Sequence, residues 1–151
     1  MSADDLYHLR FVSDPQLSPD GAQVVYVCAW VDPEDRTRYR SQIMLVPFDG
    51  SSPPRPLTSG KHRDNAPRWS PDNCSIAFVS DRDNERGQVF ILPLQGGEPR
   101  QVTSLKRGAG APVWSPNGDR IAFAARTDIA EVAQQEGQRD RKSTRLNSSH
   151  T

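Results

Sequence analysis

The sequence predicts an all-β fold, and two observations predict it. One pattern occurs as WSPDNCSIAFVSDRD from residue 69 and again as WSPNGDRIAFAARTD from residue 114, and a third copy, LSPDGAQVVYV, begins at residue 17. In addition, the expected inner strands are apolar at consecutive positions, as at 76–79 and 89–92. A strand with one face in water would alternate, so both faces are expected to be covered. Four-stranded units of this kind, spaced 52 and 45 residues apart, predict a partial β-propeller of about two and a half blades.

The chain is expected to open with a helical lead over residues 1–12. Ser2 and Asp5 have the spacing of a capping box, in which an acidic side chain lies at the positive end of a helix. Leu6 and Leu9 form a short apolar stripe. The sequence therefore predicts one helix over residues 3–10 that packs on the first blade.

The blades are expected over residues 13–128. In each unit a first strand leads into a Ser-Pro turn, where Asp20-Gly21 or Asn117-Gly118 tolerates the positive φ of a tight hairpin. The downstream halves of the units repeat as well, since residues 42–59 match residues 88–104. Pro47 and Pro93 are expected to end their strands, because proline is unfavourable inside a sheet. The pattern predicts strands near 23–30, 42–48, 75–80, 87–93 and 120–125.

Trp69 and Trp114 occupy equivalent places at the start of their units, where the first copy has Leu17. A large side chain at this position is expected to fill the space between two blades. Both tryptophans are therefore predicted to be largely buried. An aromatic binding box would need aromatic side chains that converge on an open face, and the sequence does not indicate one.

After residue 128 the repeat stops. Residues 129–140 are polar and charged and are expected to form an insertion or linker, either a long loop or a weak helix. The segment KSTRLNSSHT, from Lys142 on, resembles a translated sequencing adapter, so residues 141–151 are expected to be a non-native tail without functional meaning.

Composition limits the possible partners and the compartment. The 19 basic and 19 acidic residues cancel, which argues against a nucleic-acid partner held by bulk charge. No apolar stretch is long enough to span a membrane, and the acidic N-terminus is unlike a signal peptide, so a cytoplasmic location is expected. Cys28 and Cys74 lie at different places in the repeat, which favours two buried thiols over a disulfide.

No catalytic, cofactor-binding or metal-binding residue is predicted. A serine nucleophile needs a base oriented beside it, and the chain contains no Gly-x-Ser-x-Gly elbow. The Ser-Pro serines are expected to be turn residues, and no motif places a partner beside a histidine. The acidic segment 81–86 lacks the spacing of a calcium loop and is expected to be a solvated turn. The serines are Ser18, Ser70 and Ser115, and the histidines are His8, His62 and His150.

The opening segment DLYHLRFVSDPQLSPDGAQVVYV resembles the start of the N-terminal β-propeller of prolyl oligopeptidase-family serine peptidases, and the blade repeats are similar to those of the acylaminoacyl-peptidase and dipeptidyl-peptidase branch. The resemblance covers residues 3 to about 138. It implies a C-terminal α/β-hydrolase domain as partner, with catalytic Ser, Asp and His in that order. None of these residues has a counterpart here, so the chain is expected to be an inactive fragment.

Two functions remain open from the sequence. In the first, the parent protein hydrolyses short peptides or acyl-peptides, and the propeller shields and gates its active site. In the second, the chain belongs to a non-enzymatic, TolB-like propeller that binds other proteins, because such propellers share the Ser-Pro-Asp-Gly repeat.

Overall fold

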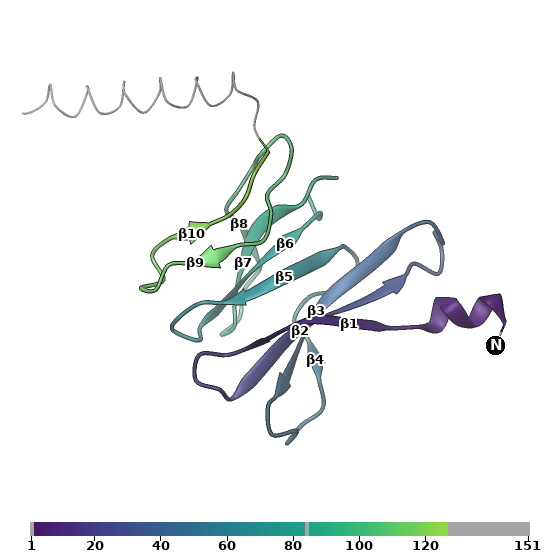
Figure 1. The fold of residues 1–151 in the computed structure, drawn as a ribbon, viewed down its shortest axis with the longest axis horizontal. Helices are drawn as coiled ribbons and strands as arrows, with labels where there is room; N and C mark the ends of the chain where they lie inside the picture. The colour runs from purple at the N-terminus through teal and green to yellow at the C-terminus, as the bar shows by residue number, and fades with distance from the viewer. Residues whose placement is uncertain (1, 84, 127–151) are drawn as a thin grey trace, which may run out of the picture.

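The computed structural model describes residues 2–83 and 85–126, and within them three antiparallel sheets form an open arc (Figure 1). A 3-10 helix, η1 (Ala3–His8), precedes the first sheet. That sheet holds β1 (Phe11–Leu17), β2 (Gln23–Val31), β3 (Tyr39–Pro47) and β4 (Arg55–Pro56) in chain order. The second holds β5 (Asp64–Trp69), β6 (Ser75–Ser80), β7 (Gln88–Pro93) and β8 (Arg100–Gln101). The third pairs β9 (Val113–Trp114) with β10 (Ile121–Ala122).

This arrangement confirms the predicted partial β-propeller. The two four-stranded sheets are complete blades, and β9–β10 are the first two strands of a third blade. The strands at 23–30, 75–80 and 87–93 are confirmed to within one residue. The strand expected at 42–48 begins three residues earlier, at Tyr39, because β2 and β3 continue to pair up to Val31 and Tyr39.

One apolar core lies between the first two blades. The register places Val25 and Leu45 on the face of the first blade that turns toward the second, and Phe78 and Phe90 on the facing side of the second blade. The rings of Phe78 and Phe90 stack with centroids 6.0 Å apart. All four side chains are at most 2% exposed, so this junction holds the larger share of the buried apolar area and of its stabilisation.

Each tryptophan also joins its blade to the preceding one by a hydrogen bond. The indole Nε1–H of Trp69 donates to the carbonyl oxygen of Gln16 at 3.0 Å, and that of Trp114 donates to the carbonyl oxygen of Arg68 at 3.1 Å. Gln16 and Arg68 are equivalent positions of the repeat, one residue before Leu17 and Trp69. The repeated tryptophan therefore anchors consecutive innermost strands.

The turns follow the predicted chemistry. Gly21 and Gly118 have φ of 73° and 76°, and Asn73 takes the equivalent place with φ of 62°. Pro47 and Pro93 are the last residues of β3 and β7, as expected from their missing N–H groups.

The first strands carry a bulge that the sequence did not indicate. Asp14 and Ala66, each followed by proline, have φ of 51° and 52°, and the register slips at these points in β1 and β5. A positive φ is uncommon for non-glycine residues, so the surrounding sheet imposes this conformation.

The N-terminal helix differs from the expectation. It is a 3-10 helix that ends at His8 and not at residue 10. The helix lies against β2 of the first blade, but Leu6 and Leu9 are 54% and 44% exposed, so the apolar stripe is only partly covered. The backbone N–H of Ser2 does donate to the Asp5 carboxylate at 2.6 Å, as a capping box requires. The contacts to the first blade are polar and aromatic: Arg36 lies 3.7 Å from Asp4 and stacks over the Tyr7 ring.

The third blade also departs from the prediction. The strand expected at 120–125 is limited to Ile121–Ala122, and Trp114 is only half-buried, whereas Trp69 is 9% exposed. The physical reason is that, among the described residues, no third or fourth strand accompanies β10. The predictions for residues 129–140 and 141–151 lie outside the described part of the chain.

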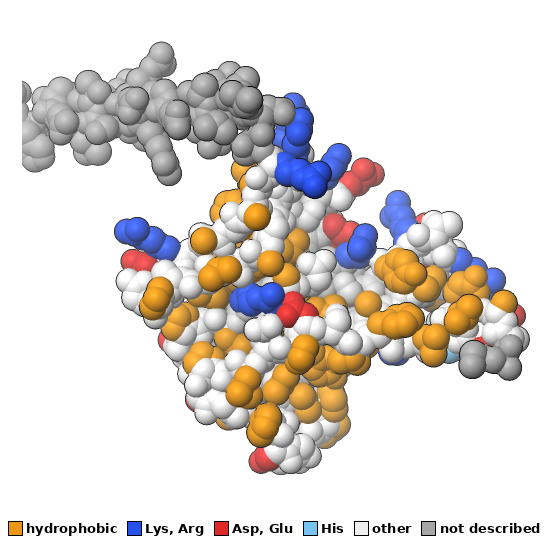
Figure 2. Space-filling model, in the orientation of Figure 1, with side chains coloured by type: hydrophobic (Ala, Val, Ile, Leu, Met, Phe, Trp, Pro, Cys, Tyr) orange, Lys and Arg blue, Asp and Glu red, His pale blue; other side chains and the backbone are white. Residues whose placement is uncertain are grey.

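The cysteines are unpaired thiols, as predicted, but they are not both buried: Cys28 is half-buried and Cys74 is exposed in the turn before β6. The outer face of the first blade, turned away from the second, exposes Val12 and Leu17 at 67% and 53%. In the space-filling view, hydrophobic side chains gather over the part of this blade next to β4 (Figure 2).

Candidate functional site

The serine hydroxyls of the Ser-Pro turns are engaged in hydrogen bonds within their own turns. The Ser18 hydroxyl donates to the Asp20 carboxylate at 2.6 Å and accepts the backbone N–H of Gln23 at 3.0 Å. The Asp20 carboxylate also accepts the N–H of Ala22 at 3.0 Å. These bonds, the Ser18 hydroxyl first, hold the pKa of Asp20 below its ordinary value.

The same arrangement recurs in the other two units. Ser70 donates to Asp72 at 2.5 Å, and this bond is the largest cause of the lowered pKa of Asp72. Ser115 donates to Asn117 at 2.8 Å and accepts the N–H of Arg120 at 3.0 Å. In each turn the serine hydroxyl is thus held between a side chain two residues on and a backbone N–H of the same hairpin, which is the geometry of a turn residue.

The described histidines and acidic clusters do not assemble a catalytic or metal site. His8 is exposed in η1, and His62 is half-buried in the connector that leads to β5, where its carbonyl oxygen accepts the N–H of Ser41 at 3.1 Å. Within residues 2–83 and 85–126 no hydrogen bond joins either imidazole to a serine, and no three His, Cys, Asp or Glu side chains come close enough to hold a metal ion. His150 lies outside the described residues. No helix in the described part of the chain is long and apolar enough to cross a membrane.

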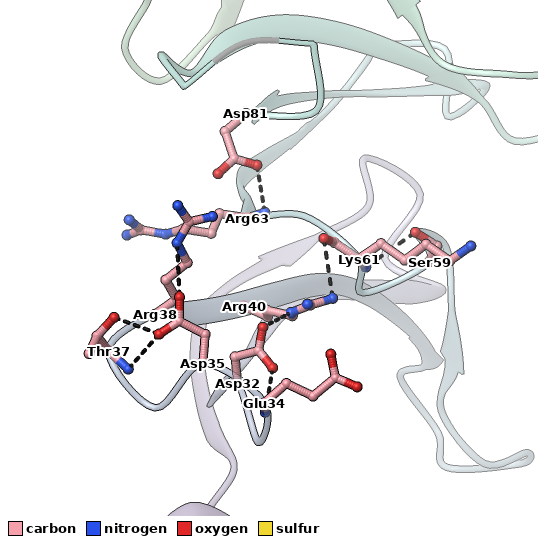
Figure 3. A network of polar contacts seen from close by, with 10 residues as sticks. All are labelled: Asp32, Glu34, Asp35, Thr37, Arg38, Arg40, Ser59, Lys61, Arg63 and Asp81. Atoms are coloured by element: carbon pink, nitrogen blue, oxygen red, sulfur yellow. Dashed lines mark hydrogen bonds and ion pairs between the residues drawn. The ribbon is translucent and has the colours of Figure 1, made fainter.

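Charged side chains gather instead at one end of the two complete blades. We call this region the charged-loop end; it consists of the β2–β3 loop (32–38), the connector 59–63 and the β6–β7 loop (81–87, with residue 84 not described). A hollow of about 640 Å³ lies between these segments. Figure 3 shows its polar contacts.

An ion pair fixes the β2–β3 loop. Asp32 is 4% exposed and lies 2.5 Å from Nε of Arg40, and its other oxygen accepts the N–H of Glu34 at 3.0 Å. The backbone N–H of Glu34, with the Arg40 guanidinium as a further cause, holds the pKa of Asp32 below its ordinary value. Arg40 also reaches the carbonyl oxygen of Lys61 at 3.5 Å, so the loop and the connector are tied to each other.

A second set of contacts ties the connector to the second blade. The backbone N–H of Arg63 donates to the Asp81 carboxylate at 2.8 Å (Figure 3). Arg82 lies 3.2 Å from Asp64, a carboxylate that is 0% exposed, and its guanidinium stacks over the rings of Phe78 and Phe90. The inner ends of the loops are therefore held rigidly against the blades.

The remaining charges of this end face outward. Lys61, Arg63, Asp83 and Glu85 line the hollow with no side-chain partner among the described residues. A rigid rim that carries both signs of charge suits recognition of a polar surface or a charged peptide. The sequence did not indicate this site, because its partners are separated by about 20 residues and leave no periodic pattern; the acidic segment 81–86 was the only visible signal.

Comparison with known proteins agrees with this fold. Residues 9–151 match the family model of the TolB beta propeller domain. The chain belongs to this family. The match extends from the end of η1 through all three units of the repeat.

The relatives found by sequence carry the name peptidase. The chain is 38% identical over 99 residues to the uncharacterized peptidase YuxL of Bacillus subtilis (strain 168), and this alignment covers 65% of this chain and 15% of that protein. It is 32% identical over 93 residues to dipeptidyl-peptidase 5 of Porphyromonas endodontalis, and this alignment covers 62% of this chain and 13% of that protein. The chain thus spans less than a sixth of the length of either relative.

Solved structures of both peptidases and TolB proteins share the fold. The acylaminoacyl peptidase of Pyrococcus horikoshii superimposes with a TM-score of 0.64 at 21% identity, over 82% of this chain and 19% of that one. TolB of Acinetobacter baumannii superimposes with a TM-score of 0.55 at 15% identity, over 80% of this chain and 39% of that one. At these identities the likeness concerns the fold alone.

Proposed function

We propose that this chain is the N-terminal part of a propeller that shields and gates the active site of a serine peptidase acting on short peptides or acyl-peptides. The observation that carries the proposal is the 38% identity to a peptidase along the blades, together with a second peptidase at 32%. The chain itself is proposed to be inactive, since the hydroxyls of Ser18, Ser70 and Ser115 are engaged in their turns. A cytoplasmic location remains part of the proposal.

The partner in this proposal is a C-terminal α/β-hydrolase domain of the same protein. We assign the charged-loop end to the contact with that domain. The N-terminal segment of the chain lies at this end: Phe11, the first residue of β1, pairs with Ala29 near the end of β2, and Arg36 of the β2–β3 loop holds η1 there. The loops and the N-terminal segment thus offer one continuous polar surface to the proposed domain. Contacts between domains of one chain are more polar than permanent interfaces, and a rim of mixed charge supports such a contact.

The test uses the complete reading frame that contains this chain. We expect the expressed protein to be labelled on one serine, within a Gly-x-Ser-x-Gly motif, by a fluorophosphonate probe and to release chromophore from aminoacyl or acyl-peptide nitroanilides. The 151-residue chain alone is the matched control and should be neither labelled nor active. Turnover by the chain that is lost when one turn serine is replaced by alanine would contradict the proposal.

The second candidate is a TolB-like propeller that binds proteins without catalysis. The family match over residues 9–151 and the TolB structure favour it. It predicts a reading frame with further blades but no nucleophile elbow, and a full-length product that the fluorophosphonate does not label. That outcome would replace the peptidase proposal.

A further inference from the structure

The turn between β3 and β4, with β4 itself, forms an exposed segment that is rich in proline. We call residues 48–56, FDGSSPPRP, the proline turn; every residue in it is exposed. Phe48, which opens the segment, is 69% exposed and is the most exposed large hydrophobic side chain in the described part of the chain. The proline turn follows the end of β3 that lies away from the charged-loop end, so the two regions are separate surfaces (Figure 1).

The second blade shows what the fold requires of such a turn. Its equivalent segment, LQGGEPRQ (94–101), is one residue shorter and contains a single proline, Pro99. In both blades the first residue after the outermost strand donates its N–H to the third strand, at 2.8 Å in the first blade and 2.9 Å in the second. The blade therefore closes in the same way without Pro53 and Pro56.

The side chains of the two turns differ in the same sense. Leu94, the equivalent of Phe48, packs on the core cluster, whereas Phe48 is left in water. Gln101, the equivalent of Pro56, donates to the carbonyl oxygen of Thr103 at 2.7 Å, a bond that proline cannot make. Hydrophobic side chains gather over this part of the first blade in Figure 2, and an exposed apolar patch of this kind marks an interaction site.

Proline chemistry also fixes the backbone of the segment. A proline ring holds φ at about −65° and confines the preceding residue to extended conformations, so residues 52–56 favour polyproline II. Among the described residues, no hydrogen bond holds the backbone of 52–54. The segment is thus ordered in advance, and its carbonyl groups are available to a partner at a small cost in conformational entropy.

The spacing of the prolines indicates the kind of partner. Pro53 and Pro56 are three residues apart, and polyproline II has three residues per turn, so both prolines lie on one side of the segment. Grooves lined by aromatic rings bind prolines with this spacing. Arg55 is exposed and makes no ion pair within the described residues, so its guanidinium is free to bind a carboxylate beside such a groove.

We propose that the proline turn is a docking segment for a protein domain with an aromatic-lined groove flanked by acidic side chains. Pro53 and Pro56 enter the groove, Arg55 pairs with a carboxylate at its margin, and Phe48 packs against its edge. This docking is independent of peptidase activity, because it uses only residues of the complete first blade.

The test uses the 151-residue chain and, as probes, purified SH3 and WW domains, which carry grooves of this kind. We expect saturable binding to at least one of these domains with a Kd below about 1 mM, measured by fluorescence anisotropy of the labelled chain. Joint replacement of Pro53 and Pro56 by alanine should weaken this binding at least about tenfold. A peptide of residues 47–58 should compete with the chain and its double-alanine version should not, which separates loss of the docking segment from loss of the fold.

A matched pair of charge variants locates the contact. Arg55→Glu places a carboxylate opposite the acidic margin of the groove and should weaken binding at least about tenfold. Arg100→Glu makes the same change at the equivalent, also exposed position of the second blade and should leave binding unchanged. Circular dichroism checks that both variants fold.

Three outcomes would overturn the proposal. The first is the absence of binding to any of the domains, and the second is binding that survives the double alanine replacement in a folded chain. The third is dimerisation of the chain that Phe48→Ser abolishes, without binding to any of the domains, which would assign the patch to a second copy of the chain.

Discussion

The hydrogen bond between Trp69 and Gln16 should account for a measurable part of the junction between the first two blades. Trp69→Phe keeps an aromatic ring but removes the N–H that donates to the Gln16 carbonyl oxygen at 3.0 Å. Because Trp69 is only 9% exposed, the carbonyl loses its partner largely out of water, at a cost of about 1–3 kcal/mol. The smaller ring leaves a cavity worth about 1 kcal/mol more.

The expected loss is therefore about 2–4 kcal/mol in the free energy of unfolding, a large part of the roughly 5–15 kcal/mol typical of a domain. Urea titration followed by far-ultraviolet circular dichroism should show a midpoint lower by about 1–2 M, for a slope of about 2 kcal/mol per M, the middle of the range for small domains. Circular dichroism is preferred to fluorescence because the variant removes one of the three tryptophans of the chain.

Trp114→Phe is the matched control. It removes the equivalent bond to the Arg68 carbonyl oxygen, but Trp114 lies in the two-stranded sheet and is only half-buried. Water can replace the lost donor there, so a cost of about 1 kcal/mol or less is expected. Equal losses in the two variants, or a Trp69→Phe midpoint unchanged from the parent chain, would refute the reasoning that burial decides the value of this bond.

Three further predictions concern the turns and the blade junction. Ser70→Ala should lower the free energy of unfolding by about 1 kcal/mol, because the hydroxyl both donates to Asp72 and accepts the N–H of Ser75; an unchanged urea midpoint would contradict its turn role. The folded state lowers the pKa of Asp20 and Asp72, so the stabilisation that these carboxylates contribute should be complete above about pH 4 and should decline as the pH falls below that. The melting temperature should therefore fall on acidification, and Ser70→Ala should weaken this dependence. A melting temperature that rises on acidification would contradict the prediction. Asp14→Ala removes the 2.8 Å ion pair with Arg68 between β1 and β5 and should cost about 0.5–1 kcal/mol at low salt and less at high salt; a cost that does not change with salt would argue against an ionic contribution.

The parts of the fold that the sequence predicted well are those in which local chemistry and repetition agree. The run 76–79 is apolar on both faces and is followed by Ser80 and Asp81, so β6 was predicted with its observed bounds. Proline at positions 47 and 93 ended the third strands because it cannot donate to the ladder.

The parts that failed depend on contacts between distant residues. Leu6 and Leu9 suggested a packed helix, but the helix ends at His8, both side chains stay largely exposed, and Arg36 of the β2–β3 loop makes the ion pair and ring contact with this segment. The charged-loop end was not predicted for a similar reason. The ion pair between Asp32 and Arg40, and the hydrogen bond from Arg40 to Lys61, form only once the blades are assembled.

The first blade carries a difference from its successors that follows from one residue. Leu17 stands where the later units have Trp69 and Trp114, and leucine has no N–H to donate to a neighbouring strand. The side chains that share its face, Val12 by register with Cys28 and Leu17 with Val24, are apolar or weakly polar. The indole hydrogen bond that joins the other blades therefore has no counterpart on this face. The two junctions inside the chain and the open face at its beginning are thus chemically distinct, although all three come from the same repeat.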